Sequence, residues 1–392
     1  MGAVTLALRG SVAVVGAGQT PYYKRGESPR STKALVLEAL IEAARDAGID
    51  PREIDGFASW GDDPSEGTHV ATTLGVHELR WSSLAWGGGG GGQVPAILQA
   101  AAAIATGQAS CVAVYRGMNQ AEEGRMPYAK GHFPHHYAAH GILTPVQVCA
   151  MRTQRMLEHD KVPASALEAL ALAGYHHAQT NPRAVAYGRP LDAEAYRASR
   201  LIAEPLRLYD CSRENDGAGA IILTSAERAR HTRGKPAWIL GGVQGFVRGW
   251  GELTENQDPY TSAGLVPSMV ERLWRESGLT PADVDVTQVY ENFTGPAVAS
   301  LIDVGLVPPG PAAGDVMTVQ NLTVPGGRLP VNTAGGNLAD GFVHGIGVVL
   351  EAVRQIRGDS PNPVPGAQVS LLLGGPAAPQ VGAVLFGSDA VV

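Results

Sequence analysis

Two short segments in the second half of the chain contain side chains that could move protons in a reaction. They are VYENFTG (289–295) and NTAGGNLADGFVHGIG (332–347). Tyr290 could act as an acid or a base, although a phenol with a pKa of about 10 needs neighbours that adjust it. The alternative is a core tyrosine at the end of a strand. His344 could act with Tyr290 or in its place, or it could fix its loop by hydrogen bonding.

Three more polar residues of these segments could support such chemistry. Asp340 could bind a substrate hydroxyl or orient His344, although an acid exposed in a turn is the more frequent case. Glu291 and Asn292 are expected to orient the first segment or to line the site. Which of Tyr290 and His344 is the base, and which is the acid, stays open.

Six consecutive glycines, 87–92, stand directly before an alanine-rich run that is expected to form a helix at 94–106. A glycine costs roughly 0.5–1 kcal/mol relative to alanine inside regular structure. Such a run therefore indicates either a slack linker or a close approach of backbone to another group. At the start of a helix, its N–H groups would form a site for an anion.

The segment GHFPHHYAAHG (131–141) is rich in histidine and lies in the middle of the chain. Pro134 disfavours a helix that would place two of these histidines on one face, so we expect no metal site. The preferred interpretation is a polar, aromatic wall that includes His136 and Tyr137 and contacts the substrate.

Charge is low and evenly distributed along the chain. The 392 residues carry 30 Lys and Arg against 37 Asp and Glu, and no basic block occurs. Nucleic acids and polybasic contacts with a membrane surface are therefore not expected. In NPRAVAYGRP (181–190), Arg183 and Arg189 could contact phosphate groups, or they could be ordinary surface arginines.

The three cysteines, Cys111, Cys149 and Cys211, lie far apart and form no CxxC pair. A disulfide framework and a zinc site are therefore not expected. The sequence also lacks a signal-peptide pattern and a run of 18 apolar residues. We expect a cytoplasmic protein with no membrane span.

An internal repeat organises the chain. ARDAGIDPREID (44–55) matches WRESGLTPADVD (274–285) at an offset of 230 residues, and AILQAAAAIATG (96–107) resembles VVLEAVRQIRG (348–358). Each match places the end of a helix before a strand. The repeat predicts two α/β halves, with an inserted region in the first.

The segment VVGAGQTP (14–21) begins like a dinucleotide-binding fingerprint. Pro21 occupies the position of the third glycine, and no helix is expected to open there. A turn that leaves a buried strand is the preferred interpretation.

The duplicated halves resemble the thiolase fold, and most closely its sterol-carrier-protein or lipid-transfer branch. The resemblance extends over nearly the whole chain and rests on VYENFTG, on the glycine-rich 332–347 segment and on 188–225. It implies a five-layer αβαβα body. Its N-terminal half is expected at 1–228, with a loop domain inserted at about 118–207, and its C-terminal half at 229–392.

The three reactive groups of a thiolase are missing. Counting along the matching motifs, Gly90 occupies the position of the cysteine nucleophile, and Phe342 occupies that of the Gly-His-Pro histidine. LLLGG (371–375) lacks the late cysteine. None of the three cysteines is placed to replace the nucleophile, so a covalent acyl-enzyme is not expected.

This pattern is similar to the thiolase-like aldolases of steroid side-chain breakdown, in which a tyrosine usually stands at the position of Phe342. The resemblance implies retro-aldol cleavage of a bulky β-hydroxyacyl-CoA to a ketone and a shorter acyl-CoA. The resemblance makes Tyr290 the first choice for the acid or base, because it falls in the catalytic box of this family. Coenzyme A would be part of the substrate, no other cofactor is expected, and Phe342 would line the site. Backbone N–H groups are expected to hold the enolate oxygen. The glycines expected to supply them are Gly90, Gly91, Gly374 and Gly375.

Two other functions stay open. The chain could be a non-catalytic subunit that binds acyl-CoA or lipid, which Phe342 favours, or an acyltransferase that works without cysteine. The resemblance also implies a homodimer, and a separate partner subunit of the OB-fold and zinc-ribbon type that would complete a heterotetramer.

Overall fold

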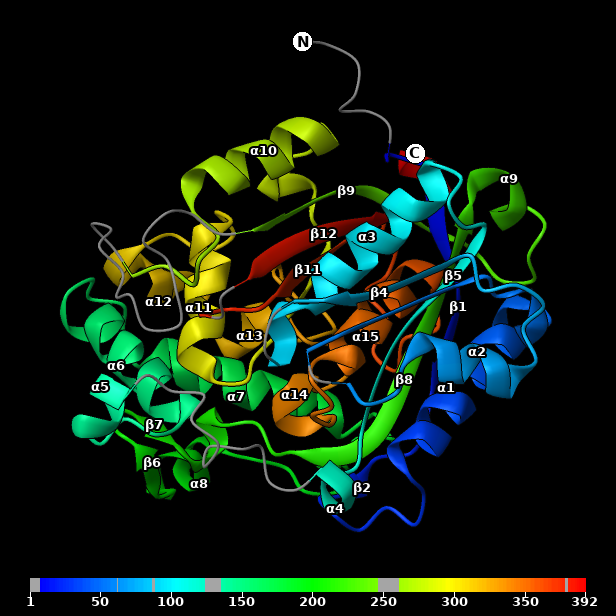
Figure 1. The fold of residues 1–392 in the computed structure, drawn as a ribbon. Coiled ribbons are helices and arrows are strands. Elements are labelled where there is room, and N and C mark those ends of the chain that lie inside the picture. The colour runs from blue at the N-terminus through cyan, green and yellow to red at the C-terminus, as the bar shows by residue number, and fades with distance from the viewer. Residues whose placement is uncertain (1–7, 62, 87–88, 124–134, 246–260, 378–379) are drawn as a thin grey trace.

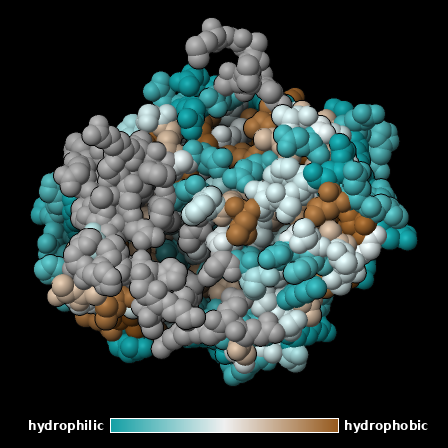
Figure 2. Space-filling model, in the orientation of Figure 1, coloured by the Kyte–Doolittle hydropathy of each residue, from teal (hydrophilic) through white to brown (hydrophobic). Residues whose placement is uncertain are grey.

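The structure, a computed structural model, describes residues 8–61, 63–86, 89–123, 135–245, 261–377 and 380–392. Its main sheet follows the order β10-β11-β12-β9-β1-β8-β5-β3-β4, and β2 pairs with the start of β8 (Figure 1). The strands before residue 228 in this sheet are β1 (Val12–Gln19), β2 (Tyr23–Lys24), β3 (Gly56–Trp60), β4 (Trp81–Ala85), β5 (Cys111–Met118) and β8 (Asn215–Ser225). The later strands are β9 (Ala237–Gly245), β10 (Val286–Val289), β11 (Val369–Gly374) and β12 (Val381–Gly387). On the face seen in Figure 2, hydrophobic residues form separate small patches.

The same ladder of strands occurs twice. In the first ladder, β1 pairs antiparallel with β8, β8 antiparallel with β5, and β5 parallel with β3. In the second, β9 pairs antiparallel with β12, β12 antiparallel with β11, and β11 parallel with β10. A short antiparallel contact joins them, with Ala13 opposite Trp238 and Val14 opposite Ala237. The duplication predicted from the repeat is confirmed.

The helices form layers on both sides of the two ladders. The helices concerned are α1 (Thr32–Ala47), α2 (Gly67–Leu74), α3 (Gln93–Ala105), α10 (Pro267–Ser277), α11 (Thr294–Asp303) and α15 (Ile346–Arg357). Both α3 and α15 contact strands of both ladders, so they lie between them. Helix α1 packs on the outer face of the first ladder, and α10 and α11 pack outside the second. This is the expected five-layer order.

The two repeated segments adopt the same local structure. Helices α1 and α10 both end at a glycine with left-handed backbone, Gly48 with φ of 71° and Gly278 with φ of 67°. Single 3-10 turns follow, at Pro51–Glu53 and Pro281–Asp283, and lead into β3 and β10. Glycine adopts this backbone conformation without steric cost, and the proline prevents the helix from continuing.

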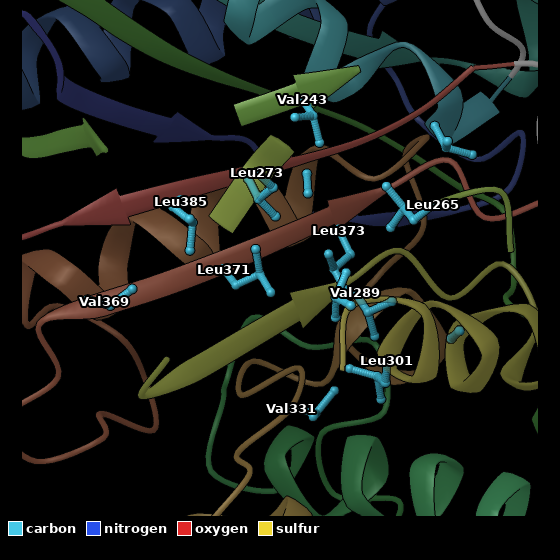
Figure 3. Packing of buried hydrophobic residues seen from close by; sticks show 14 of the residues in the cluster. Val243, Leu265, Leu273, Val289, Leu301, Val331, Val369, Leu371, Leu373 and Leu385 are labelled. Atoms are coloured by element: carbon cyan, nitrogen blue, oxygen red, sulfur yellow. The ribbon is translucent and has the colours of Figure 1, made fainter. Parts of the chain in front are cut away.

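Apolar side chains of the second ladder fill the space beneath α10 and α11 (Figure 3). Val289 of β10 lies opposite Leu373 of β11, and both side chains are fully buried. Leu301 of α11 and Leu273 of α10 are also buried in this cluster. This packing fixes the end of β10, whose last residue, Val289, is the first of the VYENFTG segment.

The glycines of VVGAGQTP lie in β1, which ends at Gln19, and residues 20–22 that follow it form no helix, as expected. A Cβ at Gly16 would come within 2.2 Å of the carbonyl oxygen of Ala43, and one at Gly18 equally close to that of Ala39. The two glycines therefore allow α1 to pack directly on the strand.

A separate group of elements is inserted between β5 and β8. Its members are α4 (Gln120–Glu123), α5 (His135–Ala139), α6 (Pro145–Glu158), α7 (Ser165–Ala178), α8 (Ala193–Ala198), β6 (Leu201–Ala203) and β7 (Leu206–Arg207). Short helices complete the later part of the chain: α9 (Ala226–Ala229), α12 (Ala313–Val316), α13 (Val319–Leu322) and α14 (Gly336–Ala339). Helix α7 contacts both α11 and α14 and so covers the two candidate segments. The domain boundaries given above stay a prediction.

None of the helices in the described part of the chain has the length and apolar character needed to cross a membrane.

Candidate functional site

Tyr290 lies at the centre of the candidate site, directly after β10. Its backbone N–H donates to the carbonyl of Leu373 at 2.9 Å, and its side chain is buried. The ring packs against two glycines of other segments. A Cβ at Gly90 would lie 2.2 Å from Cε2 of the ring, and one at Gly345 would lie 2.5 Å from Cδ2. The ring thus fills the space that a side chain at residue 90 would need.

The phenol oxygen of Tyr290 lies beside the backbone of the glycine run, where a Cβ at Gly89 would be 3.2 Å from it. Burial raises the phenol pKa well above its ordinary value, and the nearby backbone of Gly90 lowers it by a smaller amount. Tyr290 is therefore a neutral phenol at pH 7. The role expected for the Gly90 N–H, as a donor to a substrate oxyanion, stays a prediction.

Phe342 lies between Tyr290 and His344. Its ring centroid is 5.9 Å from that of Tyr290 and 5.7 Å from that of His344, and the ring is buried. Two hydrogen bonds fix its backbone, because Asn215 donates from its N–H to the Phe342 carbonyl and accepts from the Phe342 N–H at its Oδ1, both at 3.1 Å. The three aromatic residues form one continuous row.

His344 is held by a buried arginine. Its Nδ1 lies 2.7 Å from Nη2 of Arg116, and its carbonyl accepts from the indole of Trp60 at 3.3 Å. A guanidinium has only donors, so Nδ1 must be the acceptor, and the imidazole proton must lie on Nε2. In this state Nε2 of His344 carries a proton, and His344 cannot serve as a base at Nδ1.

Arg116 is the member of this group that sequence reasoning missed. It is completely buried in β5, where Nη1 lies 3.4 Å from the carboxylate of Asp63 and 2.9 Å from the carbonyl of Trp60. A charged residue in the otherwise apolar run CVAVYRG was the available signal, because arginine is rarely buried unless it is paired.

Asp340 is buried, so the expectation of an exposed turn is wrong. Its Oδ1 accepts from Nδ2 of Asn181 at 2.8 Å, and burial raises the pKa of the carboxyl to about 7. A Cβ at Gly347 would lie 2.7 Å from the hydroxyl of Tyr22 and 3.5 Å from Oδ2 of Asp340. Asp340 thus belongs to a group with Asn181 and Tyr22, whereas Nδ1 of His344 bonds Arg116.

Glu291 and Asn292 fix backbone segments around the site. Glu291 is buried, which raises its pKa to about 8, and its Oε1 accepts from the N–H of Leu338 in α14 at 3.4 Å. Asn292 accepts from Ser212 at its carbonyl and from Phe293 at its Oδ1, both at 2.9 Å. These contacts agree with an orienting role for both residues.

The predicted glycine turns meet at the start of α3. A Cβ at Gly375 would lie 2.8 Å from the Cα of Gly91, so the two backbones are in contact. A Cβ at Gly374 would lie 2.8 Å from Nε2 of Gln93, the first residue of α3. Gln93 is a further residue that sequence reasoning missed.

The predicted wall and phosphate contacts lie toward the surface. Arg183 and Arg189 are exposed, and their segment is tied to the site because the N–H of Val185 donates to the carbonyl of Asp340 at 2.8 Å. Tyr137 is partly buried in α5, and the side chain of His136 lies outside the described residues. The roles given to these four residues stay predictions. Among the residues described, no group of three His, Cys, Asp or Glu side chains could hold a metal ion.

The three cysteines have the properties of structural thiols. Burial raises the pKa of Cys111, Cys149 and Cys211 to about 12. A thiol needs a lowered pKa to act as a nucleophile at neutral pH. The site built from Tyr290, His344 and Gly90 therefore contains no activated sulfur.

Comparison with known proteins agrees with this geometry. Residues 252–386 match the family model described as thiolase C-terminal domain-like. The chain is 36% identical over 389 residues to 17-hydroxy-3-oxo-4-pregnene-20-carboxyl-CoA lyase of Mycobacterium tuberculosis, which covers 96% of this chain and 100% of the relative. The chain belongs to the thiolase superfamily.

Two further relatives place this thiolase-like protein among aldolases. It is 35% identical over 395 residues to a steroid side-chain-cleaving aldolase of Thermomonospora curvata, a match that covers 97% of this chain and 99% of the relative. The solved structure of the Ltp2-ChsH2(DUF35) aldolase superposes with a TM-score of 0.89 at 34% identity, over 98% of this chain and 99% of that one. These relatives span the full length of this thiolase-like chain and are named as lyases and aldolases.

Proposed function

We propose that this protein is a carbon–carbon lyase that cleaves the side chain of a steroidal β-hydroxyacyl-CoA to a ketone and a shorter acyl-CoA. The observation that carries the proposal is the seating of Tyr290. Its ring fills the space of a side chain at residue 90, and its hydroxyl lies 3.2 Å from the Cβ position of Gly89. An acid–base group thus takes the place that a thiolase gives to its nucleophile.

The proposed reaction needs no covalent intermediate and no further reactant. The Cα–Cβ bond breaks, and its electron pair passes to the thioester, which becomes an enolate. Tyr290 accepts the proton of the β-hydroxyl, whose oxygen becomes the ketone oxygen, and gives its own proton to Cα of the enolate. Because burial keeps the phenol protonated, this relay requires no free phenolate. His344 offers its Nε2–H to the β-oxygen.

Turnover of a defined substrate tests the proposal. The protein is incubated with 17-hydroxy-3-oxo-4-pregnene-20-carboxyl-CoA, and the ketone and the shortened CoA ester are measured by mass spectrometry. Tyr290→Phe is expected to lower kcat by about 10²–10⁴, the usual contribution of acid–base catalysis. Tyr115→Phe is the matched control, because Tyr115 is also buried but bonds the carbonyl of Ser65 and packs in the outer cluster.

The same experiment distinguishes the alternative of a non-catalytic acyl-CoA-binding subunit. Phe342 supports that alternative, because its ring carries no proton to transfer. Binding without turnover, both alone and with a co-expressed DUF35-type partner, would contradict the lyase. Formation of ketone by the wild-type chain that is lost in Tyr290→Phe would contradict the alternative.

For assembly, we propose a homodimer through β4 and a separate partner subunit. Strand β4 is the last strand of the sheet path, with Leu84 exposed, and Trp86, directly after it, is 83% exposed. The solved relative, the Ltp2-ChsH2(DUF35) aldolase, carries such a partner in its name. Light scattering of the wild type and of Trp86→Glu tests the dimer, which is expected to dissociate in the variant. Co-purification with a DUF35 protein tests the larger complex.

A further inference from the structure

Gln93 has a buried amide that no protein group in the described structure satisfies. It is the first residue of α3, its exposed fraction is 0%, and neither Nε2 nor Oε1 has a hydrogen-bond partner among the described residues. An unpaired buried polar atom costs roughly 1–3 kcal/mol, so a native protein rarely keeps two on one side chain. Such a group calls for a ligand that would pair it.

A second buried glutamine shows what a structural role looks like. Nε2 of Gln355 in α15 lies within 3.1 Å of Thr333 Oγ1, Glu351 Oε1, Ser360 Oγ and the Asn362 carbonyl. Its Oε1 accepts from the N–H of Val364 at 3.0 Å. The amide of Gln355 is thus fully used by the fold, and that of Gln93 is not.

Glycines from two other segments make room for the amide of Gln93. A Cβ at Gly345 would lie 2.3 Å from Oε1, and one at Gly374 would lie 2.8 Å from Nε2. The Cβ position of Gly345 is also 2.5 Å from the ring of Tyr290. The amide and the phenol therefore flank the same glycine, and Gln93 belongs to the site that contains Tyr290.

The backbone of Gly90 is covered by Tyr290. Gly90 is buried, and a Cβ there would lie 2.2 Å from the ring of Tyr290, so the ring covers this backbone while Tyr290 is in place. An enolate oxygen that forms beside Tyr290 needs another fixed donor in a buried setting. The amide of Gln93 is a fixed and buried donor at the start of a 13-residue helix, whose N-terminus also favours negative charge.

We propose that Gln93 binds the thioester oxygen of the acyl-CoA through its amide Nε2–H. As the Cα–Cβ bond breaks, the electron pair moves onto this oxygen, and the hydrogen bond strengthens. Gln93 is then a catalytic residue of the lyase, and this role rests on the function proposed above.

Gln93→Leu and Gln355→Leu form a matched pair that tests the role. Leucine keeps the approximate size of the side chain and removes both polar atoms. Gln93→Leu is expected to lower kcat by about 10²–10³, as loss of one oxyanion donor does, with Tm unchanged or raised. Gln355→Leu is expected to lower Tm and to leave kcat per folded enzyme unchanged. A fall in Tm with unchanged kcat for Gln93→Leu would overturn the proposal.

A binding experiment keeps this proposal separate from the lyase function. Acetyl-CoA and S-ethyl-CoA differ only in the thioester carbonyl, and calorimetry measures the affinity of each for wild type and Gln93→Leu. Wild type is expected to bind acetyl-CoA about tenfold more tightly, the order of one net hydrogen bond, and the variant is expected to lose this preference. Equal binding by wild type, or a preference kept in the variant, overturns the role of Gln93 whether or not the protein turns over a steroid.

Discussion

Helices α3 and α15 occupy corresponding places in the two duplicated halves, yet they bring different groups to the site. Both lie between the strand ladders, and both begin after a glycine, Gly92 for α3 and Gly345 for α15. The segment before α3 presents bare backbone, including the Gly90 N–H. The segment before α15 presents the side chains of Phe342 and His344.

The difference shows that neither half contains a complete site. Tyr290 comes from the second half, but its ring packs on Gly90 of the first half as well as on Gly345. His344 comes from the second half, but its Nδ1 is held by Arg116 of the first. In each pair, a residue of the first half positions a side chain of the second.

Gly90→Ala adds one methyl group to the glycine segment before α3. This substitution gives the strongest test of whether both halves contribute to the site. The Cβ of Gly90→Ala would lie 2.2 Å from the ring of Tyr290, so the ring must move. We expect kcat to fall by about 10³, within the range for loss of an acid–base group. Steady-state kinetics with the steroidal CoA ester measures the effect.

Gly358→Ala is the control for that substitution. Gly358 ends α15 with φ of 81° and has open space at its Cβ position. Alanine there carries backbone strain of roughly 1–2 kcal/mol but lies away from Tyr290. A lower Tm with unchanged kcat is expected. If Gly90→Ala kept full activity, the seating of Tyr290 would have no part in catalysis.

The second test removes Arg116, the residue of β5 that donates a hydrogen bond to Nδ1 of His344. Arg116→Met alone would leave the carboxylate of Asp63 buried near an apolar side chain, which costs about 3–5 kcal/mol. The double variant Arg116→Met with Asp63→Asn avoids that charge. We expect the imidazole of His344 to lose its single tautomer and kcat to fall by about 10–100-fold.

Nitrogen-15 NMR of the His344 ring separates positioning from simple destabilisation. The wild type is expected to show the proton on Nε2, and the double variant a mixture of tautomers. Asp63→Asn alone keeps the guanidinium and is expected to keep the Nε2 proton. The same ring spectrum for the double variant and wild type would contradict the role of Arg116.

The fold could be predicted because its signals are local and occur twice. The two segments that match at an offset of 230 residues form the same arrangement of helix, glycine and 3-10 turn. Each of these local patterns depends only on neighbouring residues. The packing role of the two glycines in VVGAG could not be predicted, because glycine serves a turn and a close packing contact equally well. Only the position of α1 decides between them, since the Cβ of Gly16 would meet the backbone of Ala43.

The site could be predicted only in part, for the same physical reason. Tyr290, His344 and the Gly90 position were found by matching short local motifs to those of the resembled family. Gln93 and Arg116 act on residues that lie more than 200 positions away in sequence, at Gly345 and His344. The burial of Asp340 was also missed, because α7 and the segment after it cover a loop that the sequence alone presents as exposed.

The third test concerns the carboxyl of Glu291, which accepts a hydrogen bond from Leu338 in the 332–347 segment. Burial raises the pKa of Glu291 from 4.5 to about 8. Between pH 4.5 and pH 8, this carboxyl is therefore protonated in the folded protein and ionised in the unfolded chain. Stability contributed by Glu291 is therefore present below pH 4.5 and falls as pH rises toward 8, by at most about 1.4 kcal/mol per pH unit. Urea unfolding of Glu291→Gln is expected to show a weaker fall between pH 6 and 7 than wild type.

Asp340 supplies an internal comparison for that measurement. Its pKa is also raised, to about 7, so it adds a loss of the same sign that Glu291→Gln does not remove. In the double variant of Glu291→Gln with Asp340→Asn, stability to urea is expected to depend still less on pH between pH 6 and 7. If the stability of the wild type and that of Glu291→Gln changed in the same way between pH 5 and 8, the result would contradict a neutral Glu291.

The smallest expected effect comes from adding a phenol to the segment before α15. The ring of Phe342 lies 5.9 Å from Tyr290 and 5.7 Å from His344, so a hydroxyl in Phe342→Tyr would enter a buried site that already has donors. We expect kcat to rise by less than about tenfold, because Tyr290 already carries the proton in both directions. In a Tyr290→Phe background, the same substitution is expected to restore part of the lost activity, since the second segment would then supply a replacement proton carrier. Activity abolished by Phe342→Tyr alone would instead mean that the site requires an apolar wall there. The two helix starts would then differ in polarity as well as in the groups they present.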